Sequence, residues 1–339
     1  MTPIARELLA PSLENFGRSS TLPAEAYTAG SVLRWEQEHF FDRGWVCAGR
    51  VGGPEVADDQ RVVEWQGWLF ANASGDAPTF EEHVGNLEEL VRNYGCEELV
   101  IAARHDYQIA ANWKILVENY HECYHCSSIH PELCEVSPPT SGGDNLEPEG
   151  AWIGGPMDLY EGVETMSLDG KSHAPNLPRL TEGQDRTVYY FQLFPNLLIS
   201  LHPDYVMTHR LSPLALGCTA VECEWLFSHE AVEQEGFDPS YASEFWDITN
   251  RQDWHACEAV QRGVSSRGYR RGPLSPREDA VYQLITMVAN GYLEGKVSRP
   301  ASRAPEVGAI RESPLHRTLA PERRTAPTPS TIRGSRGYV

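Results

Sequence analysis

The stretch ENYHECYHCSSIHPELC, residues 118–134, holds the densest set of chemically active side chains in the sequence. Apolar residues recur at helical spacing through its first half, which predicts a helix over residues 111–126. At 100° per residue, Glu118, Glu122 and His125 fall on the face opposite these apolar residues. Imidazoles and carboxylates one turn apart converge on one ion, so the pattern indicates a metal site. The alternative is a solvated polar face beside buried thiols.

Two kinds of zinc site match this stretch. Residues 121–125, HECYH, have the H-E-x-x-H pattern of zinc proteases, with Glu147 or Glu149 in the next loop as a third ligand. A structural zinc site is the other alternative, although a second C-x-x-C pair is lacking. Its ligands would be two thiols and one imidazole: Cys123, Cys126 and His130.

A third alternative is a 2-His-1-carboxylate site for Fe(II), in which His125 and His130 join a carboxylate from elsewhere in the chain. A helix predicted over residues 243–261 offers Asp253 for this role. A charge on a core-facing side of a helix is costly unless it is paired or bound to metal, and a buried pair with an Arg is the competing explanation. We favour the iron site. Asp253 shares its helix face with Phe245, Ala256, Val260 and Gly263.

Composition narrows the class of protein. The chain has 339 residues and a net charge of −20, which disfavours nucleic acid and anionic membranes as partners. Hydrophobic residues make up 41 %, enough for a core, yet no apolar run reaches the ~20 residues of a membrane span. The first residues lack the apolar segment of a secretory signal. We therefore expect a cytoplasmic protein whose eight cysteines are reduced thiols.

The order of the predicted elements indicates an α+β fold. Residues 138–178 are rich in Gly, Pro and Asp and are expected to form loops. Residues 296–339 are expected to be a disordered basic tail, because 299–339 contain eight Arg, three Glu and no apolar periodicity. Strands are predicted at 45–48, 62–71, 98–109, 187–201, 206–211 and 219–229, and further helices at 31–41 and 276–291.

Several long stretches resemble the large (alpha) subunits of Rieske non-heme iron oxygenases, the ring-hydroxylating oxygenase family. The order and spacing of these stretches agree with the family from about residue 31 to residue 293. Among subgroups, the chain is most similar to monooxygenases that act on glycine betaine and other quaternary amines. The stretches are GWVCAGRV (44–51), VEWQGWLFANAS (63–74), NWKILVENYHECYHCSSIHPEL (112–133), LFPNLLISLHPDYVMTHRLSPL (193–214) and DWHACEAVQRGVSSRGYRRGPLSPRE (253–278).

The resemblance implies a helix-grip (Bet v1-like) catalytic domain, in which an antiparallel sheet curves around a C-terminal helix. It implies mononuclear Fe(II) held by His125, His130 and Asp253, with Glu122 as the acidic residue that bridges to the [2Fe-2S] cluster of a neighbouring subunit. It also implies O2 and a small molecule as substrates. Electrons would come from NAD(P)H through a ferredoxin or flavin reductase, within a homotrimer or a mixed oligomer.

The chain departs from the family at the Rieske cluster, whose ligands come as C-x-H followed by C-x-x-H. Only residues 123–125 match C-x-H, and no cysteine begins C-x-x-H. The stretches that normally flank the cluster domain are separated only by residues 52–62, so we infer a deletion near 57–63. The expected organisation is an N-terminal remnant over 1–60, a catalytic domain over 61–295 and the tail.

These observations predict the catalytic domain of a mono- or dioxygenase with impaired electron supply. It would hydroxylate an aromatic ring or a small substrate, or demethylate a quaternary amine oxidatively. A non-catalytic ligand-binding or assembly subunit is the alternative from another class. Aromatic side chains on the predicted strands are candidates for a cation–π cage, or are core residues: Tyr189, Tyr190, Phe191, Phe194 and Tyr205.

Overall fold

The computed structural model describes residues 2–53, 61–142 and 145–302. Residues 1–303 form one compact unit, which includes the described part of the expected N-terminal remnant. Most of the expected basic tail, and part of the expected deletion point, lie outside the described residues.

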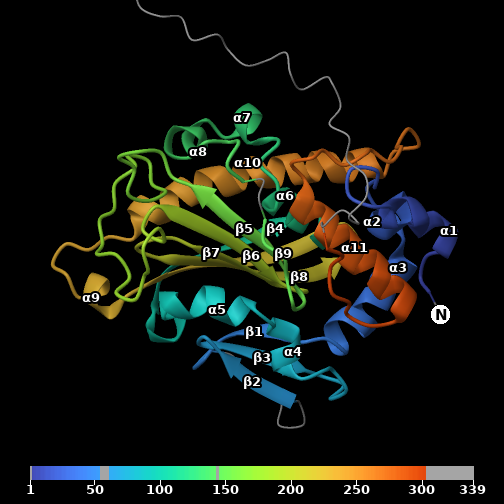
Figure 1. The fold of residues 1–339 in the computed structure, drawn as a ribbon, viewed down its shortest axis with the longest axis horizontal. Helices are drawn as coiled ribbons and strands as arrows, with labels where there is room; N and C mark the ends of the chain where they lie inside the picture. The colour runs from blue at the N-terminus through green and yellow to red at the C-terminus, as the bar shows by residue number, and fades with distance from the viewer. Residues whose placement is uncertain (1, 54–60, 143–144, 303–339) are drawn as a thin grey trace, which may run out of the picture. The chain divides into compact units, whose positions relative to one another are not determined.

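The centre of this unit is a six-stranded antiparallel sheet in the order β4-β9-β8-β7-β6-β5 (Figure 1). A second antiparallel sheet has the order β1-β3-β2. The large sheet consists of β4 (Val100–Ile109), β5 (Trp152–Asp158), β6 (Thr187–Leu193), β7 (Leu197–Leu201), β8 (Val206–Ala215) and β9 (Cys218–Phe227). The small sheet consists of β1 (Val46–Arg50), β2 (Arg61–Trp65) and β3 (Trp68–Asn72).

Helices flank both sheets, so the α+β class is confirmed. The two longest are α10 (Ser240–Val264) and α11 (Asp279–Glu294). The shorter helices are α1 (Arg6–Leu9), α2 (Ala24–Thr28), α3 (Gly30–Glu36), α4 (Phe80–Val84), α5 (Leu87–Val91), α6 (Trp113–Tyr120), α7 (Cys126–Ile129), α8 (Pro131–Val136) and α9 (His229–Val232). A π-helical segment, Gln37–Asp42, extends α3, and single 3-10 turns lie at Ala10–Leu13, Arg92–Tyr94 and Cys96–Glu98.

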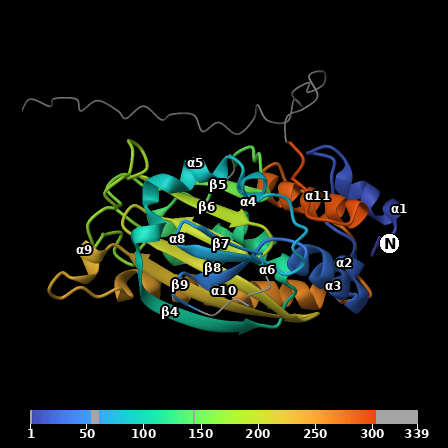
Figure 2. The same ribbon diagram turned by 90° about the horizontal axis from the view of Figure 1, so that it is seen from below.

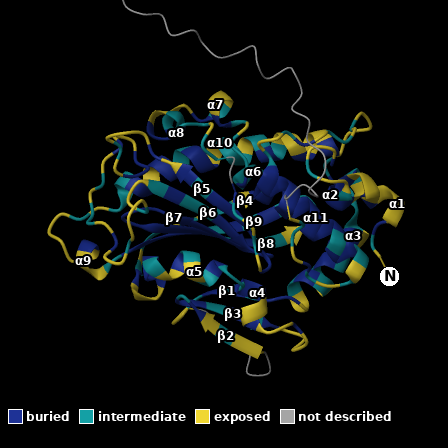
Figure 3. Cartoon of the chain, viewed as in Figure 1, coloured by how far each residue is buried: buried dark blue, intermediate teal, exposed yellow. Residues whose placement is uncertain are grey.

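Most of the large sheet is covered on both faces, because α10 and α6 lie over one side while α5 and the small sheet lie over the other (Figures 1 and 2). The edge strand β4 stays partly exposed. Successive residues of a strand point to opposite faces, so β7 contributes to two cores. Ile199 packs in the cluster that contains Phe70 of β3, and Leu198 in the cluster that contains Leu116 of α6. Figure 3 shows the contrast with β2, which is largely exposed. An antiparallel sheet packed against long helices agrees with the expected helix-grip architecture.

Two segments expected as single strands are hairpins. Residues 62–71 divide between β2 and β3, because Gln66 and Gly67 have φ values of 51° and 80° and form a two-residue turn. Residues 187–201 divide between β6 and β7, and the turn between them contains Pro195, which has no N–H to give to a strand ladder.

The described part of residues 138–178 is mostly loop, as expected, but the edge strand β5 also lies there and pairs with β6. Its signal is weak in the sequence since the strand contains Gly154 and Gly155. A Cβ on Gly154 would lie 1.9 Å from the carbonyl oxygen of Tyr190, so the close pairing of the two backbones requires glycine.

The last helix, α11, begins and ends three residues later than the predicted range of 276–291.

The buried imidazole of His83 in α4 is expected to make the stability of the fold depend on pH. Its Nε2–H donates to the carbonyl oxygen of Phe194 over 2.9 Å, and burial lowers the pKa of His83 to about 4. An unfolded histidine has a pKa of ~6.5, so the stabilisation is present above pH 6.5 and is lost as pH falls towards 4. His83→Gln keeps a hydrogen-bond donor but does not titrate. We therefore expect the variant to lose up to about 3 kcal/mol less unfolding free energy on acidification than the wild type.

Urea unfolding of both proteins at pH 7 and at pH 4.5 measures this difference. Equal losses of unfolding free energy in the wild type and in His83→Gln would contradict the assignment.

Candidate metal centre

The turn after α6 brings together the residues that the sequence placed on one helix. Asn112 caps the start of α6 by accepting the N–H of Lys114, and the helix ends at Tyr120, six residues before its predicted end. The carboxylate of Glu122 accepts the backbone N–H groups of Tyr124 and His125, which holds the chain in a turn instead of a further helical turn. The shared helix face predicted for Glu118, Glu122 and His125 is therefore wrong, although Glu122 and His125 do meet.

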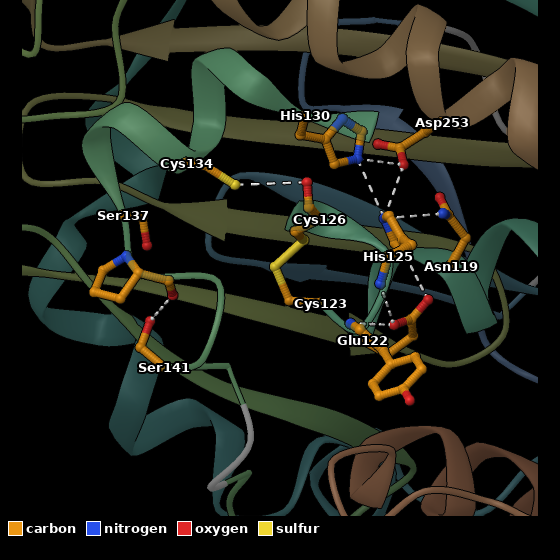
Figure 4. Close-up of a disulfide and its surroundings, with 12 residues drawn as sticks. Asn119, Glu122, Cys123, His125, Cys126, His130, Cys134, Ser137, Ser141 and Asp253 are labelled. Carbon is orange, nitrogen blue, oxygen red and sulfur yellow. Dashed lines mark hydrogen bonds and ion pairs between the residues drawn. A yellow bond between two sulfur atoms is a disulfide. The ribbon is translucent and has the colours of Figure 1, made fainter. Parts of the chain in front are cut away.

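Three ligand atoms converge beside this turn. The Nε2 atoms of His125 and His130 lie 3.2 Å apart. Oδ1 of Asp253 lies 3.2 Å from the first and 2.9 Å from the second. Figure 4 shows the three side chains pointing toward one another from the turn, from the end of α7 and from α10. The structure thus places together the three residues expected to bind iron.

These distances fit a single metal ion. Three ligands at right angles around one ion, with bonds of about 2.1 Å, are about 3.0 Å apart, and a tetrahedral arrangement gives about 3.4 Å. The observed separations, 2.9 to 3.2 Å, lie in this range and outline one face of a coordination sphere. Two neutral imidazoles and one carboxylate are the donor set of the 2-His-1-carboxylate iron sites, so the residues present suit Fe(II).

The other ring nitrogen of each histidine is held by an acceptor. Nδ1–H of His125 donates to the Glu122 carboxylate, and Nδ1–H of His130 donates to Oε1 of Gln252 over 2.7 Å. Gln252 is oriented in turn, because its Nε2 donates to Glu132 over 3.0 Å. These bonds favour the tautomers that leave both Nε2 lone pairs free for a metal.

Glu122 was expected at the site, but Gln252, Glu132 and Asn119 were not predicted from the sequence. Gln252 and Glu132 carry a weak signal, since each lies within two positions of a predicted ligand. Asn119 carries none, although its Nδ2 lies 3.3 Å from Nε2 of His125.

The protonation of His125 and the ionisation of Asp253 depend on each other. Burial opposes protonation of His125, but the hydrogen bonds to Asp253 and Glu122 outweigh it and raise the pKa of His125 to about 10. Burial also opposes ionisation of Asp253, yet the hydrogen bonds from His125 and His130 hold its pKa below the usual value. A cation among these residues is therefore favoured electrostatically, and a metal ion would take the place of the proton.

Asp253 points inward from α10, as predicted. The buried face of this helix, however, is not the face that was predicted. Val260 is 48 % exposed and Gly263 is also exposed, so two of the residues assigned to the core face do not belong to it. Single apolar residues are common on surfaces, whereas buried polar ones need partners. Asn250 bonds His209, and Gln261 bonds the backbone N–H of residue 112. The buried side chains near and beyond Asp253 include Trp246, Thr249, Asn250, Cys257, Gln261 and Val264.

The structure does not assemble the zinc-protease site. His121 lies at the end of α6 and not one helical turn before His125, and burial lowers its pKa to about 3. Within the described ranges, a cluster of His, Cys, Asp or Glu ligand atoms within 4.8 Å of one another contains His125, Cys126 and His130, but not His121. The loop with Glu147 and Glu149 is bound to Asn86 instead of approaching the site: Asn86 bonds the carbonyl of Glu147 and the N–H of Glu149.

The expectation that all eight cysteines are reduced is wrong for two of them. Cys123 and Cys126 form a disulfide, because the turn between α6 and α7 brings their Cα atoms within 4.9 Å. The same bond argues against the structural zinc site that would use both as thiolates. The other six cysteines are free.

A pocket lies beside the three ligand atoms and is lined mainly by apolar side chains. Of the five aromatic residues singled out on the strands, Tyr190 lines this pocket. Phe191, Phe194 and Tyr205 are fully buried core residues, and Tyr189 packs against the cluster under the small sheet. The pocket contains three further aromatic residues that lie on helices: Tyr120, Trp246 and Trp254.

An antiparallel sheet covered by long helices, with two histidines and an aspartate converging beside a pocket, is the arrangement expected of a non-heme iron oxygenase. The chain belongs to the ring-hydroxylating alpha subunit family, since its residues 96–294 match the catalytic domain of that family.

Relatives of known activity support this membership. The chain is 28 % identical to the glycine betaine monooxygenase oxygenase subunit of Pseudomonas aeruginosa over 238 residues, 62 % of this chain and 55 % of the relative. It is 27 % identical to the carnitine monooxygenase oxygenase subunit of Escherichia coli over 215 residues, 62 % of this chain and 53 % of the relative. The chain thus spans little more than half the length of these relatives.

Solved structures have the same fold. The quaternary ammonium Rieske monooxygenase CntA superposes with a TM-score of 0.66 at 18 % identity, over 85 % of this chain and 98 % of that one. Naphthalene 1,2-dioxygenase from Rhodococcus sp. superposes with a TM-score of 0.59 at 14 % identity, over 86 % and 96 % of the two chains. In the part of the chain that is described, no helix has the length and apolar character needed to cross a membrane.

Proposed function

We propose that this chain is the catalytic part of an iron-dependent oxygenase that hydroxylates a small substrate or demethylates a quaternary amine oxidatively. The observation that carries the proposal is the triangle of His125, His130 and Asp253 ligand atoms beside an aromatic-lined pocket. Fe(II) held by these residues would supply the redox chemistry that activates O2.

The chain's own side chains would bind and orient the substrate. Tyr120, Tyr190, Trp246 and Trp254 line the pocket, and the faces of aromatic rings attract quaternary ammonium groups. The buried apolar lining also excludes water from the reacting centre. An aromatic substrate would suit the same walls, so a hydroxylated ring is the competing product.

Glu122 would support the metal and link it to an electron donor. Its carboxylate bonds Nδ1–H of His125 and two backbone N–H groups, so it connects a ligand to the turn between α6 and α7. We propose that electrons reach the iron past this residue.

The chain's residues do not suit a [2Fe-2S] cluster of its own, because the required C-x-x-H is missing from the sequence. We therefore propose a mixed oligomer with a Rieske-bearing subunit, reduced from NAD(P)H by a reductase. We also propose that the reaction takes place in the cytoplasm, where a reductase can draw on NAD(P)H. The lack of cluster ligands also favours a second candidate, a non-catalytic ligand-binding or assembly subunit.

Formaldehyde release and O2 uptake test the proposal. The Fe(II)-loaded chain, a reductase and NADH are combined with betaines or aromatic acids, with and without a Rieske-bearing oxygenase subunit that is itself inactive through loss of its iron ligands. We expect substrate-coupled turnover only when that subunit is present. Fast turnover without it would contradict the proposed partner, and no turnover under any condition would favour the non-catalytic candidate.

A further inference from the structure

Cys126 places a sulfur atom beside the two histidines that are proposed to bind iron. Its Sγ lies within 4.8 Å of a ring nitrogen of His125 and a ring nitrogen of His130. The residue opens α7 and is only 4 % exposed. Figure 4 shows the sulfur beside the two imidazoles and bonded to Cys123. The proposed mechanism does not use it.

The oxidation state of this sulfur determines whether it can bind a metal. A disulfide sulfur carries no charge and is a poor ligand, whereas a thiolate is a strong, soft one. Reduction by a dithiol breaks the Cys123–Cys126 bond: two electrons and two protons pass to the two sulfurs, and the dithiol becomes a disulfide. On metal binding, the Cys126 thiol would release its proton to solvent and form the bond through Sγ.

We propose that the Cys123–Cys126 pair gives the centre two ligand sets, and so determines which metal ion it retains. In the disulfide form the set is His125, His130 and Asp253, which suits Fe(II) with open positions. In the dithiol form the set is His125, His130 and Cys126, whose ligand atoms lie within 4.8 Å of one another, and two imidazoles with a thiolate suit Zn²⁺. This inference rests on the metal centre of the proposed function.

The pair is open to a reductant. Cys123 is only partly buried, and both cysteines line the pocket that contains the metal ligands, so a small dithiol entering the pocket meets the bond directly. Cys134 offers a matched control, because it is a free cysteine on α8 whose Sγ lies 3.5 Å from the carbonyl oxygen of Cys126.

Absorption of bound Co²⁺ tests the proposal, since it reports on sulfur ligation separately from metal binding. Metal-free full-length chain is titrated with Co²⁺ anaerobically in the oxidised form, and again after phosphine reduction and removal of the reductant. We expect visible d–d bands in both forms and an ultraviolet sulfur-to-cobalt charge-transfer band in the reduced form alone. Cys134→Ser should behave as the wild type.

Two variants act in opposite directions. Cys123→Ser leaves Cys126 without its disulfide partner and should show the sulfur-to-cobalt band without any reductant. Cys126→Ser should lack the band in every state and, when reduced, bind Zn²⁺ at least about tenfold more weakly than the reduced wild type, the lower end of what losing a residue that supports a metal site costs.

The outcomes separate the two proposals. Visible bands without a charge-transfer band, in both the reduced wild type and Cys123→Ser, would overturn the sulfur ligation and leave the three-ligand centre intact. Absence of every cobalt band in both forms would overturn the metal centre itself, and the ligand switch with it.

Discussion

Asp253→Ala is expected to abolish stable Fe(II) binding, with a loss of affinity above about 100-fold. Removing a residue that only hydrogen-bonds to a metal ligand already lowers metal affinity by about 10–100-fold, so loss of a ligand itself should cost more. Asp253 contributes the only negative charge of the triangle, and its Oδ1 lies within 3.2 Å of both histidine Nε2 atoms. The iron content of the purified chain and a direct Fe(II) titration measure the effect.

Matched variants show whether the loss of Fe(II) affinity is caused by removal of the carboxylate ligand. Asp253→Asn keeps the size of the side chain and one oxygen but removes the charge, so we expect a loss close to that of Asp253→Ala. Glu244→Gln changes an exposed carboxylate on the same helix and should retain full iron content. His121→Ala should also retain the metal, because His121 lies outside the triangle. Full iron content in Asp253→Ala would refute the assignment of this ligand.

Lys114→Met is expected to lower the free energy of unfolding by about 3–5 kcal/mol, the usual cost of removing one partner of a buried ion pair. Lys114 and Glu36 are fully buried, and Nζ lies 2.7 Å from Oε1 of Glu36. Trp113 Nε1–H and the Tyr292 hydroxyl also donate to that carboxylate. The substitution would leave a buried negative charge beneath α6, directly before the turn that contains the candidate metal ligands.

Urea unfolding at pH 7 measures this change. The double variant Glu36→Gln/Lys114→Met removes both charges and keeps an acceptor for Trp113 and Tyr292, so most of the lost stability should return. Lys171→Met provides the exposed counterpart. Lys171 and Glu164 are about half exposed, and a pair of this kind contributes only about 0–1 kcal/mol. A double variant no more stable than Lys114→Met would show that packing, not charge, causes the loss.

Sequence patterns were sufficient where the evidence for an element is local. The strand at β4 and the helix at α10 follow from local runs of apolar residues. The candidate metal ligands follow from the spacing of His125 and His130 and from Asp253 on a helix face expected to point inward. The hairpins at Gln66–Gly67 and Pro195 were read as continuous strands, although both turns contain residues that commonly break strands. The edge strand β5 could not be read from its glycines, since those residues are required by the neighbouring backbone of β6.

The sequence by itself determined the family, the α+β class and the three candidate ligands His125, His130 and Asp253. Only the tertiary structure decided how these ligands meet. Asp253 is 123 residues from His130 in the chain, and packing of α10 against α6 and α8 brings it to the turn. Only the folded chain could pair Cys123 with Cys126, or place Gln252 against His130, because hydrogen bonds and sulfur contacts depend on where helices end and how they pack.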